Sequence, residues 1–175
     1  MARYARTQGM VAGVLLVLLG PAALAADPPR TPPPTGCHMP AYRQFDFWLG
    51  DWEVSQGERI AGRNRIEATL EGCAIAEHWR GGANTDGRSF TVYDRKAGMW
   101  RQFWVDNRGG VLQLAGGRAE DGSMVLASEP DADGTRQEIR WTALPDGSVR
   151  QLWQRVAADG SRTTAFDGLY RPRRD

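Results

Sequence analysis

Histidine is almost absent from this sequence, which has only His38 and His78 among 175 residues. Neither lies in a ligand spacing such as His-x-x-x-His, so the sequence predicts no zinc site. The chain also lacks a Gly-x-Ser-x-Gly motif and a phosphate-binding loop, and Ser89 has no histidine nearby in sequence to act as its base. We therefore expect no metal, no other cofactor and no serine-nucleophile or nucleotide chemistry.

The sequence has no excess of charge of either sign, because 22 basic side chains accompany 21 acidic ones and the formal net charge is +1. Removal of the first 26 residues takes away two arginines and leaves a formal charge of −1. A nucleic-acid-binding surface usually shows a basic field. The charge balance therefore predicts no nucleic-acid partner.

Long apolar runs are also missing. The apolar run within residues 1–26 is shorter than the roughly 20 residues that a transmembrane helix needs. It follows the positive charges of Arg3 and Arg6 and precedes small residues that suit cleavage near Ala25 or Ala26. This layout is typical of a secretory signal peptide. We expect no membrane span, removal of residues 1–26, and a periplasmic or secreted location.

Cysteine is scarce as well, since only Cys37 and Cys73 are present. In a chain that leaves the cytoplasm, a single disulfide between them is the default. It would close a loop of about 35 residues and stabilise the fold by roughly 3–4 kcal/mol through the entropy of the unfolded chain. The alternative, a redox-active pair, usually has the close Cys-x-x-Cys spacing, which this sequence lacks.

Proline is concentrated in one place, because residues 27–40 contain six prolines and little that a core can bury. Proline fixes φ and removes a backbone donor, so this stretch is predicted to be an extended, solvated leader. Cys37 would tie its end to the folded domain, which we place at residues 41–175. That length is enough for one domain with a core of its own.

The densest group of aromatic residues opens this domain. Phe45, Phe47 and Trp48 lie within four residues, and Trp52 follows shortly after. Each such ring can bury roughly 150–250 Å² and needs a shared interior. We predict a short helical turn that ends near Leu49, followed by the first strand of a closed sheet.

Short alternating runs follow, separated by glycine turns such as Asp86-Gly87 and Asp121-Gly122. Asp-Gly between such runs is a strong hairpin signal, because both residues tolerate positive φ. The predicted strands are residues 51–56, 64–70, 74–80, 89–94, 99–106, 111–118, 123–128, 135–144, 149–157 and 163–171. Ten strands joined by hairpins predict an all-β, antiparallel up-and-down barrel, because closure removes both exposed edges. A sandwich of two sheets is the alternative.

Several of these strands place tryptophan in one row with amides or carboxylates, since side chains alternate between the two faces of a strand. The residues concerned are Gln102, Trp104, Asp106, Trp141, Gln151 and Trp153. Apolar walls with a few polar groups suit a small-molecule cavity, so we expect these six residues to line one. Alternation does not say which face is inside. The alternative places the tryptophans in a filled core or on the outer surface.

Two carboxylates, Glu77 and Asp106, alternate with tryptophans on their strands. A carboxyl group against apolar rings has its pKa raised by desolvation and can move a proton near neutral pH. Both residues are therefore candidates for acid–base catalysis. The alternative is that each is solvated or paired with an arginine.

The opening block of residues 45–52, Phe-Asp-Phe-Trp-Leu-Gly-Asp-Trp, resembles that of an uncharacterised family of secreted bacterial proteins. This family is a domain of unknown function that is grouped with the lipocalin-like, or calycin, β-barrels. The similarity continues through residues 72–79 and 98–106 and ends at residues 166–171, so it covers nearly the whole domain. The resemblance implies a secreted bacterial barrel and does not name a ligand.

In calycin barrels a Gly-x-Trp opens the first strand, and an arginine from the last strand packs over the indole. The resemblance thus implies a cation–π contact, worth roughly 0.5–2 kcal/mol, between Trp52 and Arg171, with Arg173 as the second candidate. Haem-binding nitrobindin-like barrels look similar but hold iron through a late histidine, and no histidine follows His78 here. Some lipocalin-like barrels, such as phenolic acid decarboxylases, are enzymes, but this sequence has no matching catalytic motif.

Three functions are compatible with these patterns. The first is an exported barrel that binds a small, partly apolar molecule in its interior. The second is an enzyme that uses Glu77 or Asp106 as a proton carrier, and the third is a structural or interaction module with a filled interior. An interior void of about 300 Å³ or more favours binding, whereas a solid interior leaves only the third function. The oligomeric state is left open.

Overall fold

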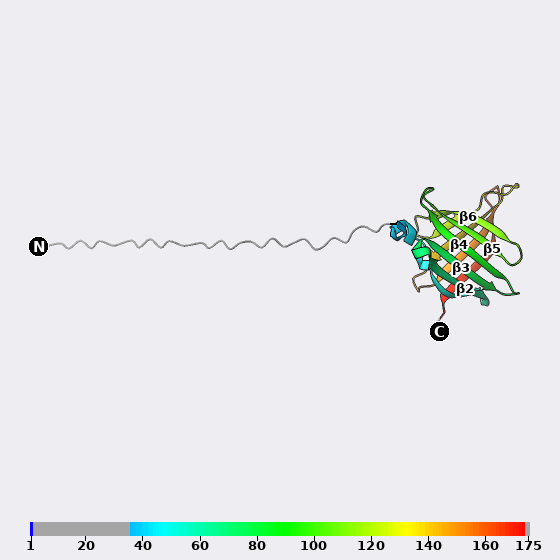
Figure 1. Cartoon of the computed structure of the whole chain (residues 1–175), viewed down its shortest axis with the longest axis horizontal. Helices are drawn as coiled ribbons and strands as arrows, with labels where there is room; N and C mark the ends of the chain where they lie inside the picture. The colour runs from blue at the N-terminus through cyan, green and yellow to red at the C-terminus, as the bar shows by residue number, and fades with distance from the viewer. Residues whose placement is uncertain (2–35, 174–175) are drawn as a thin grey trace. The chain divides into compact units, whose positions relative to one another are not determined.

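Ten antiparallel strands form one closed barrel (Figure 1) in the computed structural model, which describes Met1 and residues 36–173. The strands are β1 (Gly50–Gln56), β2 (Arg59–Thr69), β3 (Ala74–Gly81), β4 (Asp86–Asp94), β5 (Met99–Asp106), β6 (Val111–Arg118), β7 (Met124–Ala127), β8 (Arg136–Ala143), β9 (Val149–Val156) and β10 (Arg162–Pro172). Each strand pairs with the next along the chain, and β1 pairs with β10 to close the circle. The predicted ten-stranded antiparallel barrel is confirmed. The predicted signal peptide and most of the predicted leader lie outside the described residues.

Two strands begin earlier than predicted, whereas the other predicted strand ends lie within one residue of the observed ones. β2 begins at Arg59 rather than at residue 64, and its pairing with β1 contains a bulge in which Ala61 has no partner in β1. A bulge of this kind adds one residue to a strand and shifts its alternation, so the pattern before the bulge no longer matches the pattern after it.

The start of β4 corrects a predicted turn. Asp86-Gly87 belongs to the strand, and Ala83 and Asn84 make the turn instead, with φ of 53° and 56°. Gly87 is required for a different reason, because a Cβ at this position would lie 2.1 Å from the indole of Trp104. Glycine inside a strand often marks such a close approach rather than a turn.

Three short 3-10 helices precede the barrel strands: η1 (Gly36–His38), η2 (Pro40–Arg43) and η3 (Asp46–Trp48). Phe45 and Trp48 are fully buried and stack with ring centroids 5.1 Å apart. Their rings also contact Trp100 and Trp141 at centroid distances of 5.1–5.6 Å. We call these four rings the aromatic plug, because they fill one end of the barrel. The predicted helical turn before β1 is confirmed as η3.

The disulfide between Cys37 and Cys73 is present, as predicted. It joins η1 to the residue that follows η4 (Leu70–Gly72), directly before β3. The prediction of an extended leader is wrong for residues 36–40, because the disulfide holds this end of the leader on the barrel in short helical turns. None of the helices in the described residues has the length and apolar character that a membrane span requires.

The predicted cation–π contact between Arg171 and Trp52 is wrong, because the two side chains lie on opposite faces of the barrel wall. Arg171 pairs with Glu53, the neighbour of Trp52, and is exposed. Its guanidinium donates a hydrogen bond to Ser55 Oγ at 3.3 Å on the outer face. Arg173, the second candidate, is exposed as well.

Trp52 is covered from inside the barrel instead. Tyr170 packs edge-on against it, with ring centroids 6.2 Å apart. The indole Nε1 of Trp52 donates a hydrogen bond to the backbone oxygen of Trp48 at 2.9 Å. β10 therefore does cover Trp52, but through Tyr170, one residue before the predicted Arg171.

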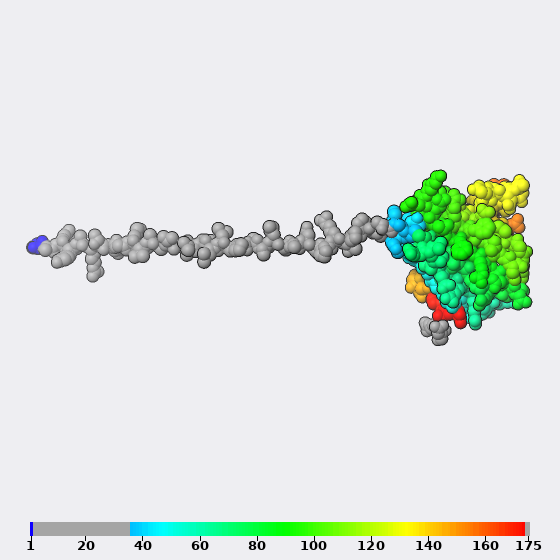
Figure 2. Space-filling model, viewed as in Figure 1, coloured from blue at the N-terminus to red at the C-terminus, as the bar shows by residue number. Residues whose placement is uncertain are grey.

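The side of the barrel shown in Figure 2 carries exposed apolar residues on β4 and β5. Phe90 and Phe103 are 61% and 48% exposed and lie directly opposite each other in the ladder. The alternation that exposes Phe103 turns Gln102 and Trp104 toward the interior. The structure thus decides which face of β5 is inside.

We expect the double variant Cys37→Ser and Cys73→Ser to lose roughly 3–4 kcal/mol of unfolding free energy, because the unfolded chain regains the entropy of the opened loop. Urea unfolding followed by tryptophan fluorescence measures the loss. Wild-type protein treated with a reductant should lose the same amount and controls for the substitutions. A loss below about 1 kcal/mol in both would show that the disulfide does not constrain the fold.

The covering of Trp52 can be tested by two substitutions in the closing strands. Trp52→Ala removes a buried ring and should cost about 3–5 kcal/mol of unfolding free energy. Arg171→Ala alters an exposed side chain and should cost less than about 1 kcal/mol. Chemical denaturation of both variants measures these values. A cost for Arg171→Ala as large as that for Trp52→Ala would restore the predicted arginine–indole contact.

Candidate functional site

A cavity of about 270 Å³ lies inside the barrel, on the far side of Trp141 from the rest of the aromatic plug. Trp141 belongs to both, because its ring contacts Phe45 and also lines the cavity. The lining residues are Glu77, Trp79, Thr85, Gln102, Trp104, Asp106, Leu112, Ile139, Trp141, Gln151, Trp153, Ala165, Phe166 and Tyr170. All six residues expected to line a cavity are among them. Their binding of a ligand stays a prediction.

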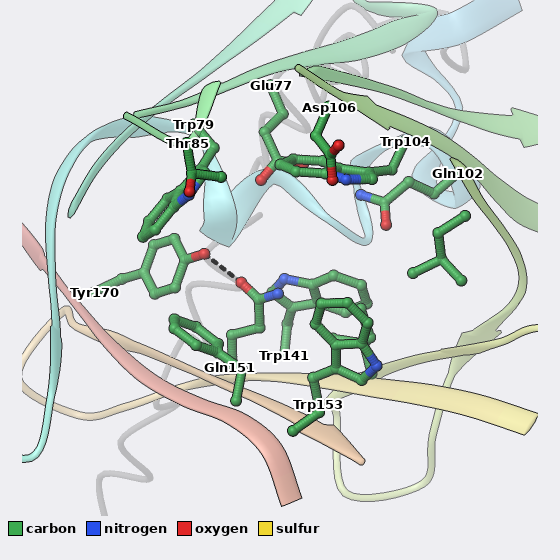
Figure 3. Close-up of a pocket in the computed structure, with 14 residues that line it drawn as sticks. Glu77, Trp79, Thr85, Gln102, Trp104, Asp106, Trp141, Gln151, Trp153 and Tyr170 are labelled. Carbon is green, nitrogen blue, oxygen red and sulfur yellow. Dashed lines mark hydrogen bonds between the residues drawn. The ribbon is translucent and has the colours of Figure 1, made fainter. Parts of the chain in front are cut away.

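Six of the fourteen lining residues are aromatic, and their rings surround the cavity (Figure 3). Trp104 on β5 lies across the space from Trp141 on β8 and Trp153 on β9. Trp79 and Phe166 pack edge-to-face with ring centroids 6.1 Å apart. Such rings present apolar faces that carry partial negative charge to whatever occupies the cavity.

Two of these tryptophans owe their positions to glycines on neighbouring backbone. Trp104 lies against Gly87 of β4, as described above, and Trp79 lies against Gly81, where a Cβ would approach the indole Nε1 to 2.6 Å. A larger residue at either glycine would push the ring out of its place in the wall. The glycines thus allow two large rings to lie close to the backbone and leave the centre of the barrel open.

A network of polar side chains surrounds the buried carboxyl group of Glu77, which is 7% exposed. Its two oxygens accept hydrogen bonds from Asn64 Nδ2 at 2.7 Å and from Ser89 Oγ at 2.6 Å. Asn64 Nδ2 also lies 3.3 Å from the hydroxyl of Tyr170, which donates to Gln151 Oε1. Residues of five strands are thereby joined inside the barrel, and no basic side chain takes part in these hydrogen bonds.

Burial has a large effect on the two titratable groups of this network. Desolvation raises the pKa of Glu77 above its ordinary value of 4.5, and the hydrogen bonds from Asn64 and Ser89 only partly oppose it. Desolvation also raises the pKa of Tyr170 well above 10.0, and the nearby Glu77 raises it further. Glu77 therefore holds its proton at higher pH than a solvated glutamate does.

Asp106 differs from Glu77 and corrects the expectation that both carboxyl groups have raised pKa values. It lies at the end of β5, where its Oδ1 accepts hydrogen bonds from the backbone N–H of Gly110 at 2.8 Å and of Arg108 at 2.9 Å. These bonds lower the pKa of Asp106, with a further contribution from the Trp104 side chain. Asp106 is therefore an ionised carboxylate fixed at the border of the cavity.

The two predicted glutamines are held by neighbouring side chains. Gln102 Nε2 donates to Thr91 Oγ1 at 3.0 Å and to Ser89 Oγ at 3.3 Å. Gln151 accepts the hydroxyl hydrogen of Tyr170 (Figure 3). Each amide is thus oriented by the wall, as a group that positions a ligand would need to be.

His78 lies outside the cavity. It follows Glu77 on β3 and therefore points to the opposite face, where its Nε2 lies 3.2 Å from Asp86 Oδ2. Among the described residues, no three His, Cys, Asp or Glu side chains are arranged to hold a metal ion.

Sequence patterns did not identify the cavity residues of β10. A bulge in its pairing with β9 passes Ala165 over, so Phe166 falls out of the alternation that precedes it. Tyr170 was not considered, because the resemblance to calycin barrels pointed to the neighbouring Arg171. In the structure Tyr170 lies opposite the buried Val54 in the ladder and therefore faces the interior. Trp79 shares a strand face with Glu77, and Ile139 shares one with Gln137 and Trp141, but neither was among the six residues expected to line the cavity.

The sequence matches no protein-family model, and no curated protein is significantly similar to it. The interpretation of the site therefore depends on the cavity, its lining and its charges.

The raised pKa of Glu77 predicts a specific dependence of stability on pH. The folded protein binds this proton more tightly than the unfolded chain does, so the contribution is fully present below about pH 4.5 and is lost as pH rises through the folded pKa. Glu77→Gln cannot ionise and should therefore become more stable relative to wild type as pH rises from 4.5.

Urea unfolding of both proteins between about pH 4 and pH 8 measures this difference. Glu53→Gln, which removes an exposed carboxylate from the outer face, is the matched control and should not follow the trend. A difference between Glu77→Gln and wild type that stays constant with pH would contradict the assignment.

Proposed function

We propose that this protein is an exported barrel that binds a small, partly apolar molecule in its interior cavity. The observation that carries this proposal is the lining, in which Trp79, Trp104, Trp141 and Trp153 surround the space together with a few oriented polar groups. Ligand sites combine apolar walls with such groups. Protein interiors are otherwise close-packed and contain few voids larger than a water molecule.

The cavity volume limits the size of the ligand. At about 270 Å³, the cavity falls slightly short of the roughly 300 Å³ that was expected to favour binding, which is also the lower end of the range usual for pockets holding drug-sized molecules. A cavity of roughly 150 Å³ is enough for one benzene ring. The site is thus suited to a molecule of one or two rings, or an aliphatic molecule of similar size.

The proposed location is the bacterial periplasm or the extracellular space. The disulfide supports it, because such bonds persist in oxidising compartments. The signal-peptide layout of residues 1–26 and the resemblance to secreted calycin barrels point in the same direction.

Glu77 supports a second candidate function, an enzyme that moves a proton inside the barrel. It lines the cavity and its pKa is raised, as a proton carrier near neutral pH requires. Both of its oxygens, however, accept hydrogen bonds from Asn64 and Ser89. These bonds hold the carboxyl group in the wall and favour binding over proton transfer. The cavity also supports binding over the third function, a module with a filled interior.

Titration with 1-naphthol, a neutral probe with two rings, tests the proposed function. The seven tryptophans give seven indole N–H signals in a ¹H–¹⁵N NMR spectrum. The signals of Trp79, Trp104 and Trp153 should shift on titration. The signal of Trp100, whose Nε1 is bonded to Gln44 Oε1 at 3.0 Å in the plug, should stay in place.

A matched pair of variants checks that the probe enters the cavity. Leu112→Trp places a large ring in the lining and should weaken 1-naphthol binding by about tenfold or more. Ile60→Trp adds the same ring at a 60% exposed position on β2, outside the lining, and should leave binding unchanged. Equal binding of 1-naphthol to both variants, or absence of wild-type binding both by 1-naphthol and by the indole compounds used below, would overturn the proposed function.

A further inference from the structure

We infer that the cavity selects a small organic cation, that is, an amine or quaternary ammonium group carried on an apolar body. This inference rests on the proposed function and specifies the chemistry of its ligand. It depends on three features of the cavity: the sign of its charged groups, the faces of its aromatic rings, and the absence of arginine from its lining.

The charged groups that line the cavity are both acidic. Glu77 and Asp106 project from β3 and β5 on the same side of the space, with Trp104 close to both (Figure 3). The described lining contains no Lys, Arg or His side chain. An anionic ligand would meet two carboxyl groups with no cation to compensate, so the lining discriminates against it.

This absence contrasts with the rest of the chain, in which arginine is abundant. On the outer surface, acidic residues pair with it, as Asp94 does with Arg101 at 2.9 Å and Asp167 with Arg150 at 2.7 Å. Glu77 has hydrogen bonds only from neutral side chains, although it is buried. A buried carboxyl group without a cation is costly to ionise, and a cationic ligand would supply the missing charge.

The aromatic lining favours the same ligand. A cation over the face of an indole is attracted by the ring quadrupole, most strongly where water is excluded. Trp104 presents such a face beside the carboxyl groups, and Trp141 and Trp153 lie across the space (Figure 3). Carboxylates combined with several indoles recognise an ammonium group, while the remaining apolar surface covers the body of the ligand.

The approach to the cavity is also predominantly acidic. A wider depression shares Trp104, Asp106, Leu112 and Trp153 with the cavity and adds Glu129, Asp131 and Arg155 to its charged groups. Arg108 lies next to Asp106 and opposes part of its charge. The three carboxylates outnumber the two arginines, so this depression favours cations over anions.

Binding of a cation is coupled to the protonation of Glu77. An ammonium group beside this carboxyl group stabilises its ionised form, so binding displaces the proton and strengthens as pH rises. The groups that face Glu77 are Asn64 from β2, Ser89 from β4, Tyr170 from β10 and, within the cavity, Asp106. Burial raises the pKa of Glu77 and that of Tyr170, whereas hydrogen bonds lower the pKa of Asp106. Glu77 is therefore the group that a bound cation can deprotonate as pH rises above 4.5.

Three indole compounds of nearly equal size test the inference: tryptamine, tryptophol and indole-3-acetate. They carry an ammonium, a hydroxyl and a carboxylate group on the same ring system, and the amine stays charged through pH 8. Isothermal titration of the whole protein is expected to show tryptamine bound about tenfold or more tightly than tryptophol, and indole-3-acetate bound most weakly. The preference for tryptamine over tryptophol should grow as pH rises from about 5, because Glu77 then ionises more readily beside the bound cation.

Two variants assign the preference to the carboxyl groups. Glu77→Gln should weaken tryptamine binding about tenfold and remove its pH dependence, with tryptophol binding changed by less than about threefold. Asp106→Asn, at the border of the cavity, keeps the acceptor oxygen that the loop N–H groups use and should weaken tryptamine about threefold. It provides the test if Glu77→Gln does not fold. Glu53→Gln on the outer face is the control and should bind all three compounds as the wild type does.

The outcomes separate this inference from the proposed function. If tryptophol binds as tightly as tryptamine and Leu112→Trp abolishes both, the cavity is a binding site but does not select cations. If 1-naphthol binds and none of the three indoles does, the inference also fails while the proposed function stands. If no compound of either set binds, both are overturned.

Discussion

The hydrogen-bonded ladder between β1 and β10 is the constraint on which the rest of the structure depends. It converts a sheet with two exposed edges into a closed wall, so that every strand has one face inside. Once the wall is closed, every second side chain must fit a space that water can enter only from the ends. The aromatic plug fills one end of this space. The rings beyond it line the wall and leave the centre open.

Much of the fold could be predicted from the sequence, because two independent signals agree along most of the chain. Alternating residues mark the strands, and Asp-Gly pairs such as Asp121-Gly122 mark the turns between them, with Gly122 at φ 84°. The predictions fail where a residue acts through a distant neighbour. Gly87 was predicted to be part of a turn, but it lies in β4 and leaves space for the ring of Trp104. Ala61 lies in a bulge and has no partner in β1.

The sequence predicted which residues of the candidate site share a strand face, but not whether that face points into the barrel. Alternation places Gln102 with Trp104, and pairing with β4 and β6 carries that row around the barrel, but only the closed structure shows that the row points inward. The resemblance to calycin barrels gave the correct strand for covering Trp52 but the wrong face. Arg171 faces outward because one position in a strand separates it from the inward Tyr170.

The network around Glu77 shows how the wall accommodates a carboxyl group without a counter-ion. Asn64 and Ser89 donate to it directly, and Tyr170 joins the network through Asn64, so its position is set by the registers of three different strands. Such a network favours one arrangement of the wall, because any slip of register would leave several buried polar groups without partners. The same residues that make the interior polar thereby fix how the strands align.

The aromatic plug and the neighbouring Trp52–Tyr170 pair both join distant parts of the chain, since Phe45 of the plug contacts Trp141 and Trp52 contacts Tyr170. These rings cannot be shielded from water until β8 to β10 have joined the sheet. Contacts between such remote segments form slowly, because a long loop must close before they are made. During synthesis from the N-terminus, the interior of the barrel therefore stays unassembled until the last three strands of the chain are available.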